Sequence, residues 1–307
     1  MAISAGLLLS ATFGFKIYDG ALATFNLDTD DFKNFEEIKK HPHYCFTDKV
    51  KIKLEDSQEV MIKDICPDDL LASDIIVTGH ITIDINKEIP IYNYNGVEVT
   101  GEHLVFDKGM WKRIKDINNI TMKVKYVDKL YCLITENNLL NINDNLFRDY
   151  SETDNIVTKT YINYYVLRDI NRNITSNPIN RVCLKESVYH TYINCFTKDI
   201  YDRITNNPKN ENNIIGKVVL TNSVDIKLYD YCGYILSGNI IVYEEGRWIR
   251  IWMSKNATQT NGLKINYLYN IISNNNVLYI DDKIKIRDFT EIPDSEKISS
   301  LVMEDLN

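Results

Sequence analysis

The chain has 307 residues, of which 44% are hydrophobic and 25% are charged. These proportions are typical of a soluble globular protein that can bury the cores of two ordinary domains. The formal net charge of -8 argues against general nucleic-acid binding, because proteins of that class carry an excess of basic residues. No run of lysines and arginines stands out either, so we expect no nucleic-acid partner.

The first 25 residues are apolar, and three roles stay open for them. Residues 2–15, AISAGLLLSATFGF, carry no charge, and the next ten residues add only Lys16 and Asp19. The stretch is shorter than the ~20 residues that a membrane helix needs, and it lacks the basic start of a secretory signal. It can pack on a core, insert into a membrane or anchor to a partner, and packing is the simplest expectation. The acidic segment 26–40 then predicts a solvated helix.

From Cys45 onward the sequence predicts a mostly β fold of many short antiparallel strands. Residues 49–56, KVKIKLED, alternate between apolar and polar with period two, which indicates a strand with one buried face. Later segments show the same pattern: 74–85, 89–94, 97–106 and 129–142. The connections between them are short and contain Asn, Asp or Gly, as is typical of antiparallel sheets.

The second half of the chain repeats the first half. A constant offset places VTGEHLVFDKGMW (99–111) on LSGNIIVYEEGRW (236–248). Two further pairs of segments align when the offset grows by one position each time: 130–138 with 268–276, and 148–152 with 287–291. Because the order is kept and the gaps are single residues, we infer two tandem copies of one β fold.

The repeat divides the chain into four predicted parts. Residues 1–44 are an apolar and acidic extension, and residues 45–155 are the first copy. Residues 156–190 are a connector with some strand and helix of its own, and residues 191–307 are the second copy.

Six cysteines are spread along the chain: Cys45, Cys66, Cys132, Cys183, Cys195 and Cys232. None forms a Cys-x-x-Cys pair, and the five histidines do not cluster apart from His41 and His43 beside Cys45. These two could form a metal clip with Cys45, but a solvated loop is the simpler interpretation, so we expect no metal and no other cofactor. We expect reduced thiols in a reducing compartment, because a chain of this size needs no disulfide framework. The opening CFTDKV (45–50) has a counterpart in CFTKDI (195–200), although the offset between these two segments is larger than in the rest of the repeat.

Four sequence blocks of the first copy occur in the order and at the separations found in one known domain family. They are CFTDKVKIKLEDSQEVMIKDICPDDLL, VTGEHLVF, LYCLITENNLLNI and FRDYSE. Together they resemble the Hint domain, the autoprocessing module of hedgehog proteins and inteins, over roughly residues 45–155. They are most similar to the Hint-like domains of proteins from large DNA viruses. The second copy matches this family only through the first.

The resemblance implies an N-to-S acyl shift at the peptide bond between Tyr44 and Cys45. The thiol of Cys45 would attack the Tyr44 carbonyl and form a thioester, since sulfur is a good nucleophile near neutral pH. His103 would protonate the departing amide nitrogen, and Thr100 would hold the same nitrogen by a hydrogen bond. Gly101 would allow the tight turn that brings both side chains to one spot. The chain would then act on itself, with no turnover in trans.

The second copy lacks the central residue of this motif. His103 aligns with Ile240, which cannot move a proton, and Thr100 aligns with Ser237. Full splicing has no candidates, because the first copy ends in SETDN rather than in His-Asn before Cys, Ser or Thr. The carboxylates Asp149 and Glu152 recur in the second copy and are interpreted as structural.

A structural role remains the alternative. The second copy indicates that the fold has value without the chemistry, so the chain would then be a non-catalytic virion component, a minor capsid or membrane-associated protein. In that case Cys45 and His103 would be core residues, and Thr100 would be a β-former. A hydrolase acting in trans is a weaker possibility, because the motif lacks an orienting carboxylate. A viral context implies partners among virion or assembly proteins, an optional membrane contact through residues 1–25, and a location in the host cytoplasm or the virion.

Overall fold

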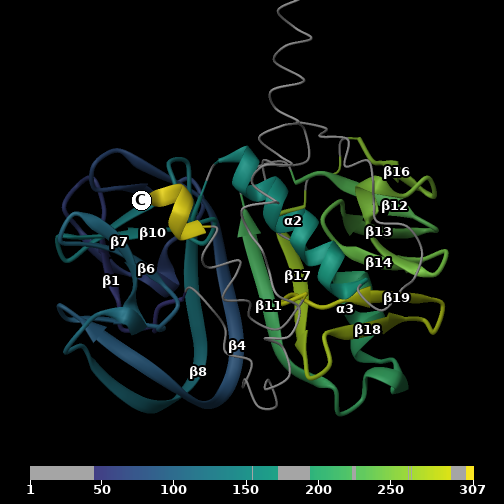
Figure 1. Cartoon of the computed structure of the whole chain (residues 1–307), viewed down its shortest axis with the longest axis horizontal. Helices are drawn as coiled ribbons and strands as arrows, with labels where there is room; N and C mark the ends of the chain where they lie inside the picture. The colour runs from purple at the N-terminus through teal and green to yellow at the C-terminus, as the bar shows by residue number, and fades with distance from the viewer. Residues whose placement is uncertain are drawn as a thin grey trace, which may run out of the picture. The chain divides into compact units, whose positions relative to one another are not determined.

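The structure of the chain is a computed structural model that describes most residues after the extension. The described residues are 45–153, 155–171, 194–222, 226–261, 263, 265–291 and 302–307. The predictions for residues 1–44 therefore lie outside the described residues. All the described residues belong to one compact unit, in which strands predominate (Figure 1), so the prediction of a mostly β protein is confirmed. Within the described part of the chain, no helix is both long and apolar enough to cross a membrane.

The first copy consists of antiparallel strands joined by tight turns. Its strands are β1 (Lys51–Lys53), β2 (Glu59–Met61), β3 (Leu70–Leu71), β4 (Ile75–Tyr94), β5 (Val97–Val99), β6 (Leu104–Asp107), β7 (Met110–Arg113), β8 (Thr121–Thr135), β9 (Leu139–Ile142) and β10 (Asn145–Arg148). The 3-10 turns η1 (Ile62–Asp64) and η2 (Ile114–Asp116) follow β2 and β7. Most residues with positive φ are Asn, Asp or Gly, the types that tolerate a left-handed backbone in turns.

The longest strand, β4, differs from the prediction. We predicted separate strands over 74–85 and 89–94, whereas β4 runs through both. Its register with β8 shifts between Asp84 and Lys87, where Asn86 has a φ of 51°. A bulge of this kind bends a strand without ending its pairing. The polar residues between the two predicted strands therefore mark a bend rather than a turn.

The segment 97–106 was predicted as one strand but forms two. Strand β5 ends at Val99, β6 begins at Leu104, and a turn separates them. Within this turn the backbone N–H of His103 donates to the carbonyl oxygen of Thr100 at 3.3 Å. The two side chains of interest therefore lie at the ends of a turn rather than along a strand.

From β4 onward the second copy repeats the strand order of the first, with two strands in place of β4 and two in place of β8, whereas α3 and η4 stand where the first copy has β1–β3. Its elements are α3 (Lys198–Thr205), η4 (Pro208–Asn210), β11 (Ile214–Asn222), β12 (Leu228–Tyr231), β13 (Tyr234–Ser237), β14 (Ile241–Glu244), β15 (Arg247–Arg250), η5 (Ile251–Met253), β16 (Ala257–Gln259), β17 (Tyr267–Ser273), β18 (Val277–Ile280) and β19 (Ile284–Arg287). The elements β6, β7 and η2 return as β14, β15 and η5, at the same offset as the sequence segments 99–111 and 236–248. Strands β9 and β10 return as β18 and β19, and the offset grows by one position at each of these two strands. The bounds agree residue for residue, which confirms two tandem copies of one fold.

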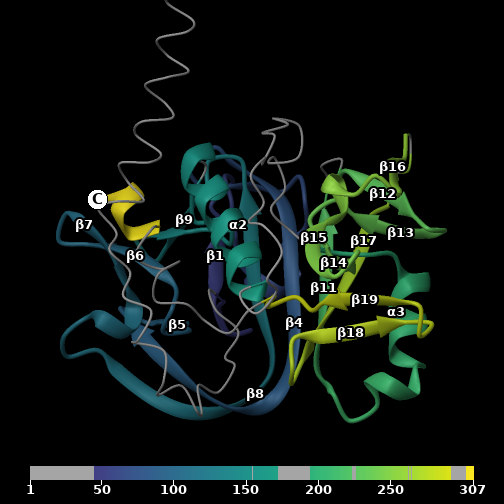
Figure 2. The same ribbon diagram turned by 45° about the vertical axis from the view of Figure 1, so that its right-hand side comes forward.

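The two copies share one sheet and one of their clusters of buried residues. Strand β11 pairs antiparallel with β4, from Lys217 opposite Asp84 to Asn222 opposite Gly79. Strand β17 pairs with β11, and β8 pairs with β4, so the sheet runs from one copy into the other. Figures 1 and 2 both show β11 beside β4. A cluster of buried residues draws on both copies, among them Ile81, Ile83, Leu130, Val218, Leu220 and Leu268.

Each copy is followed by a helix that packs on the other copy. Helix α2 (Ile156–Ile170) lies within the predicted connector 156–190 and packs on Trp248 of the second copy. A short helix over 302–306 follows the second copy and packs on Trp111 of the first.

Two asparagines fix these helices by matching contacts. The Oδ1 of Asn171 accepts a hydrogen bond from the backbone N–H of Trp248 at 2.7 Å, and its Nδ2 donates to the Trp248 carbonyl at 2.8 Å. Asn307 makes the same two bonds with the backbone of Trp111, at 2.9 and 3.1 Å. The segment that follows each copy thereby adds hydrogen bonds to the backbone of a strand in the other copy.

Candidate active site

The peptide nitrogen of Cys45 is held by Thr100. Its N–H donates to the Oγ1 of Thr100 at 3.0 Å, in the interior of the protein. The Thr100 backbone adds a second contact, because its N–H donates to the carbonyl oxygen of Cys45 at 2.9 Å. These two residues of the predicted site are thus in direct contact. The nitrogen concerned belongs to the peptide bond between Tyr44 and Cys45.

The position of Cys45 is fixed by its neighbour Phe46. Phe46 bridges Tyr131 of β8 and Val99 of β5. It exchanges two backbone hydrogen bonds with Tyr131, at 2.8 and 2.9 Å. The side chain of Cys45 is fully buried, with 0% of its surface exposed. The thiol therefore lies in a well-defined place that is shielded from bulk water.

His103 lies at the other end of the same turn and is buried, with 1% of its surface exposed. Its ring meets the ring of Phe46 edge-on, with the centroids 4.3 Å apart. Its Nε2 lies 2.9 Å from the carbonyl oxygen of Arg148. Because a carbonyl oxygen can only accept, Nε2 carries a hydrogen, and Nδ1 is the nitrogen that gains and loses a proton. The structure thus places a buried acid–base group against the residue that follows Cys45.

Gly101 is needed for space rather than for backbone freedom. We predicted that it allows a tight turn, but it is not among the glycines with positive φ. A Cβ at this position would meet the ring of Tyr92 at 2.8 Å. In the second copy, a Cβ on Gly238 would meet the ring of Tyr229 at 2.7 Å. The turn therefore packs flat against a tyrosine in both copies.

A buried ion pair supports the turn, and the motif alone did not predict it. Arg113 at the end of β7 is 2% exposed and pairs through both terminal nitrogens with the carboxylate of Glu152. Its Nη1 also donates to the carbonyl oxygen of Glu102 at 2.6 Å. Arg250 and Glu291 repeat the ion pair in the second copy. Because both copies keep it, we assign the pair to support of the turn and not to the chemistry.

Asp149 ties down the chain just before Glu152. Its carboxylate accepts hydrogen bonds from the backbone N–H groups of Thr135 at 2.7 Å and Ser151 at 2.8 Å. Burial raises the pKa of Asp149 to about 6, while these hydrogen bonds act in the opposite direction. In the second copy Asp288 accepts from the N–H of Ser273 at 2.7 Å. The repetition indicates a structural role for this carboxylate.

The second copy keeps the geometry of the site without an imidazole. The N–H of Cys195 donates to the Oγ of Ser237 at 2.9 Å, and the N–H of Ser237 donates back to the Cys195 carbonyl at 2.8 Å. Ile240 stands fully buried where the first copy has its histidine. Burial raises the pKa of the Cys195 thiol to about 12. The amide nitrogen is therefore held in the same way, but the side chain at position 240 cannot move a proton.

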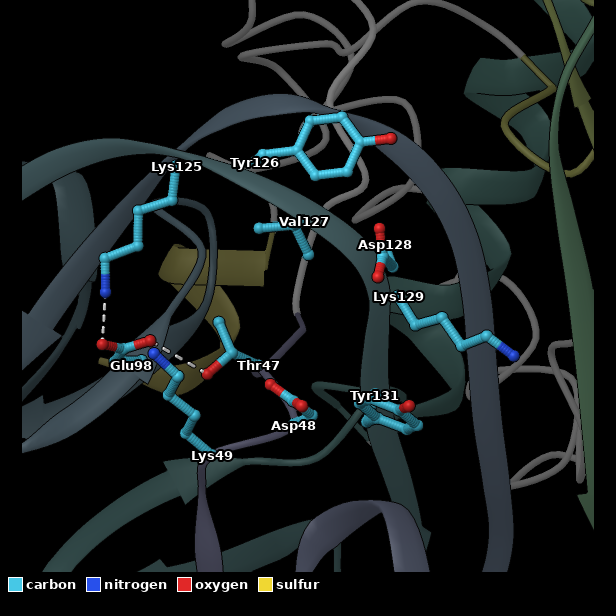
Figure 3. A pocket seen from close by; sticks show the side chains of 10 residues that line it. All are labelled: Thr47, Asp48, Lys49, Glu98, Lys125, Tyr126, Val127, Asp128, Lys129 and Tyr131. Atoms are coloured by element: carbon cyan, nitrogen blue, oxygen red, sulfur yellow. Dashed lines mark hydrogen bonds and ion pairs between the residues drawn. The ribbon is translucent and has the colours of Figure 1, made fainter.

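A pocket of about 250 Å³ opens on the surface near the start of the first copy. It is lined by Thr47, Asp48, Lys49, Glu98, Lys125, Tyr126, Val127, Asp128, Lys129 and Tyr131 (Figure 3). Glu98 accepts a hydrogen bond from the Thr47 hydroxyl at 3.2 Å and forms an ion pair with Lys125, as the dashed lines in Figure 3 show. Charges of both signs line the pocket, and we assign it no ligand. Its contacts fix the segment that follows Cys45.

No protein-family model matches the chain, and no curated protein is similar to it. Among solved structures, a variant of the Ssp DnaB mini-intein matches with a TM-score of 0.26 and 12% sequence identity, over 36% of this chain and 97% of that chain. A DnaB intein from Synechocystis sp. PCC 6803 matches with a TM-score of 0.25 and 14% identity, over 34% of this chain and 97% of that chain.

Among the residues that the structure describes, no group of three His, Cys, Asp or Glu side chains is placed to hold a metal ion.

Proposed function

We propose that the chain is a Hint-type autoprocessing protein that rearranges its own Tyr44–Cys45 peptide bond by an N-to-S acyl shift. The observation that carries the proposal is the 3.0 Å hydrogen bond between the Cys45 N–H and Thr100 Oγ1. This contact engages the nitrogen of the bond that the adjacent thiol would attack. A buried imidazole, His103, belongs to the same turn.

The chemistry follows from the groups present. The Sγ of Cys45 attacks the carbonyl carbon of Tyr44, the C–N bond breaks, and the carbonyl carbon stays bonded to sulfur as a thioester. The proton that leaves the thiol is balanced by the proton that the nitrogen gains as it becomes a free amine. Water or another nucleophile then opens the thioester and separates residues 1–44 from residues 45–307.

Each supporting residue has a distinct task in this scheme. Thr100 fixes the nitrogen, which must lose its planar amide geometry during the reaction. His103 exchanges protons at Nδ1, because Nε2 is engaged with the Arg148 carbonyl at 2.9 Å. The buried setting strengthens both effects, since hydrogen bonds and charges interact more strongly away from water.

The direct test is the mass of the purified full chain after incubation with dithiothreitol near neutral pH. We expect wild type to yield two products that end and begin at Tyr44 and Cys45. Cys45→Ala should stay whole, while Cys195→Ala in the second copy should still be cleaved. Wild type that stays whole under these conditions would refute the proposal.

One observation favours a second candidate, a purely structural protein. The second copy makes the same amide–hydroxyl contact, between Cys195 and Ser237 at 2.9 Å, although Ile240 replaces the histidine. The contact therefore has a structural use of its own, since a buried N–H needs an acceptor. A full-length chain recovered from mature particles or cells, with no trace of the 45–307 product, would favour this candidate.

A further inference from the structure

Two cysteines of the first copy face each other across neighbouring strands. Phe46 and Tyr131 are paired antiparallel and exchange both of their backbone hydrogen bonds, at 2.8 and 2.9 Å. One step back from Phe46 and one step forward from Tyr131, the register sets Cys45 opposite Cys132. The pair next to a hydrogen-bonded pair is a non-hydrogen-bonded pair, the closer of the two kinds, with Cα atoms about 4.5 Å apart.

This spacing suits a disulfide. The Cα atoms of bonded cysteines lie about 4.4–6.8 Å apart, and the non-hydrogen-bonded spacing falls within that range. The side chains also point toward each other, because the Cys132 thiol lies within hydrogen-bonding reach of the Cys45 sulfur. Both side chains are 0% exposed and belong to the same core cluster.

The setting disfavours the thiolate of Cys132. Burial is the main cause that raises the pKa of Cys132 well above its ordinary value, and the contact with Cys45 adds to it. Thiolates rather than thiols react with oxidants, so Cys132 reacts with an oxidant slowly at neutral pH and faster at higher pH. A small peroxide reaches fully buried sulfurs more easily than a bulky disulfide such as oxidised glutathione.

We propose that Cys45 and Cys132 are a redox pair, in which a peroxide forms a reversible disulfide that withdraws the nucleophile of the acyl shift. The gating part rests on the proposed function, whereas the disulfide itself does not. The thiolate of one cysteine reduces the peroxide and becomes a sulfenic acid. The other thiol then displaces water from it to form the S–S bond. In total, two thiols and one hydrogen peroxide give one disulfide and two waters, and a dithiol or phosphine reverses the oxidation.

The second copy supplies an internal comparison. Phe196 bridges Tyr269 as Phe46 bridges Tyr131, so Cys195 stands opposite Asn270. Asn270 donates from Nδ2 to the carbonyl oxygen of Asn194 at 2.5 Å. The copy without the imidazole thus also lacks the second thiol. The redox pair and the acid–base group occur together in one copy and are absent together from the equivalent positions of the other.

The test uses the full chain, hydrogen peroxide and hydroxylamine, which opens thioesters without reducing disulfides. Wild type is treated with peroxide at pH 8, alkylated, digested without reduction and mapped by mass spectrometry. We expect one new linked species that joins the peptides containing Cys45 and Cys132. Oxidised chain should be cleaved by hydroxylamine at least ten times more slowly than reduced chain, and the phosphine TCEP should restore the rate. Cys66→Ser removes an exposed thiol and should change none of these results.

The outcomes separate the two ideas. Peroxide that gives no Cys45–Cys132 link, in a chain that hydroxylamine still cleaves, would overturn the redox pair and leave the proposed function standing. Cys132→Ser is the matching control for the identity of the disulfide. After peroxide treatment this variant must lack the linked species that joins the two peptides. A link that forms in a chain never cleaved even when reduced would support the disulfide but overturn its gating role, together with the proposed function.

Discussion

At the scale of single residues, the two copies differ in kind at one point of the amide-holding motif. Cys45 and Cys195 are both thiols, and the backbone N–H of each donates to a hydroxyl oxygen, of Thr100 at 3.0 Å and of Ser237 at 2.9 Å. Of the nucleophile, the hydroxyl and the imidazole, only the imidazole is replaced by a group of different chemistry. Burying an imidazole costs free energy unless it is hydrogen-bonded, and His103 meets that condition through the Arg148 carbonyl. Under the proposed function, this position is the one that serves the reaction.

Replacing His103 by isoleucine, the residue at the equivalent position 240, tests whether the imidazole takes part in the proposed reaction. We expect His103→Ile to slow thiol-induced cleavage by about 100-fold or more, the usual effect of losing a general acid or base. The fold should survive, because Ile240 is fully buried at the equivalent place. Cleavage rates by mass spectrometry and the thermal midpoint measure the two effects. Thr100→Ser, which keeps a hydroxyl, should lose less activity; equal rates for His103→Ile and wild type would contradict the assigned role.

The motif predicted these residues, but it did not predict their supports. The spacing of Thr100 and His103 is local, so a sequence pattern can reveal it. The pairing of Arg113 with Glu152 and the opposition of Cys45 and Cys132 depend on strand register, which no local pattern encodes. Comparing the copies offered a signal for the ion pair, since arginine and glutamate recur in both. No such signal existed for Cys132, because the second copy has Asn270 there.

At the scale of elements, the pairing of β4 with β11 depends on a glycine. A Cβ at Gly216 would lie 2.7 Å from the backbone oxygen of Asp84, which cannot move without breaking the strand pairing. We expect Gly216→Ala to lower the free energy of unfolding by about 1–3 kcal/mol, the usual cost of overpacking. Gly79 is the matching position in the first copy, where a Cβ would meet the movable Cδ1 of Ile134 at 3.0 Å. Urea unfolding should show a smaller loss for Gly79→Ala, and a larger loss there would contradict the packing account.

A histidine within β4 gives the element a pH dependence. Burial lowers the pKa of His80 below its usual 6.5, although a hydrogen bond to the Ile65 carbonyl acts the other way. Below pH 6.5 the unfolded chain binds a proton that the folded chain resists. The free energy of unfolding should therefore fall as the pH drops from 6.5 toward the lowered pKa. His80→Gln does not titrate, so urea unfolding at pH 7.5 and 5.5 should show a smaller difference for it than for wild type. An equal difference would exclude His80 as the cause.

The two halves of β4 also show what apolar–polar alternation in the sequence can and cannot predict about strands. Alternation predicted both halves correctly, because each half has one face in a core. It did not predict their union, since a bulge at Asn86 breaks the alternation without breaking the pairing. We did not predict the segment 121–128 at the start of β8, although Met122, Val124 and Tyr126 alternate there with Lys123 and Lys125. All three apolar side chains are exposed, so alternation indicates a strand here but does not indicate which face is buried.

At the scale of the whole molecule, the two copies are joined by a shared sheet and also by helices that each pack on the other copy. The helix that follows each copy packs on the other, and Asn171 and Asn307 bond the backbones of Trp248 and Trp111. The shared sheet and the shared cluster of buried residues add to this coupling. Each copy has a buried cluster of its own, but these further contacts join the two copies, and we therefore expect the described unit to unfold as one.

Tryptophan fluorescence can test that cooperativity copy by copy. Trp248→Phe combined with Trp252→Phe leaves Trp111 as the reporter of the first copy, and Trp111→Phe leaves reporters in the second copy alone. For each variant, the urea midpoint from fluorescence should coincide with its own midpoint from far-UV circular dichroism, as a two-state transition requires. Midpoints that separate would show that the copies unfold independently.

The thioester is the intermediate on which the proposed function depends, and it can be trapped. Hydroxylamine added to freshly purified full chain should release residues 1–44 with a hydroxamate on the carbonyl of Tyr44, together with a product whose free N-terminus is Cys45. Cys45→Ala should give neither product. An uncut wild-type chain, or cleavage at any other bond, would contradict the acyl shift.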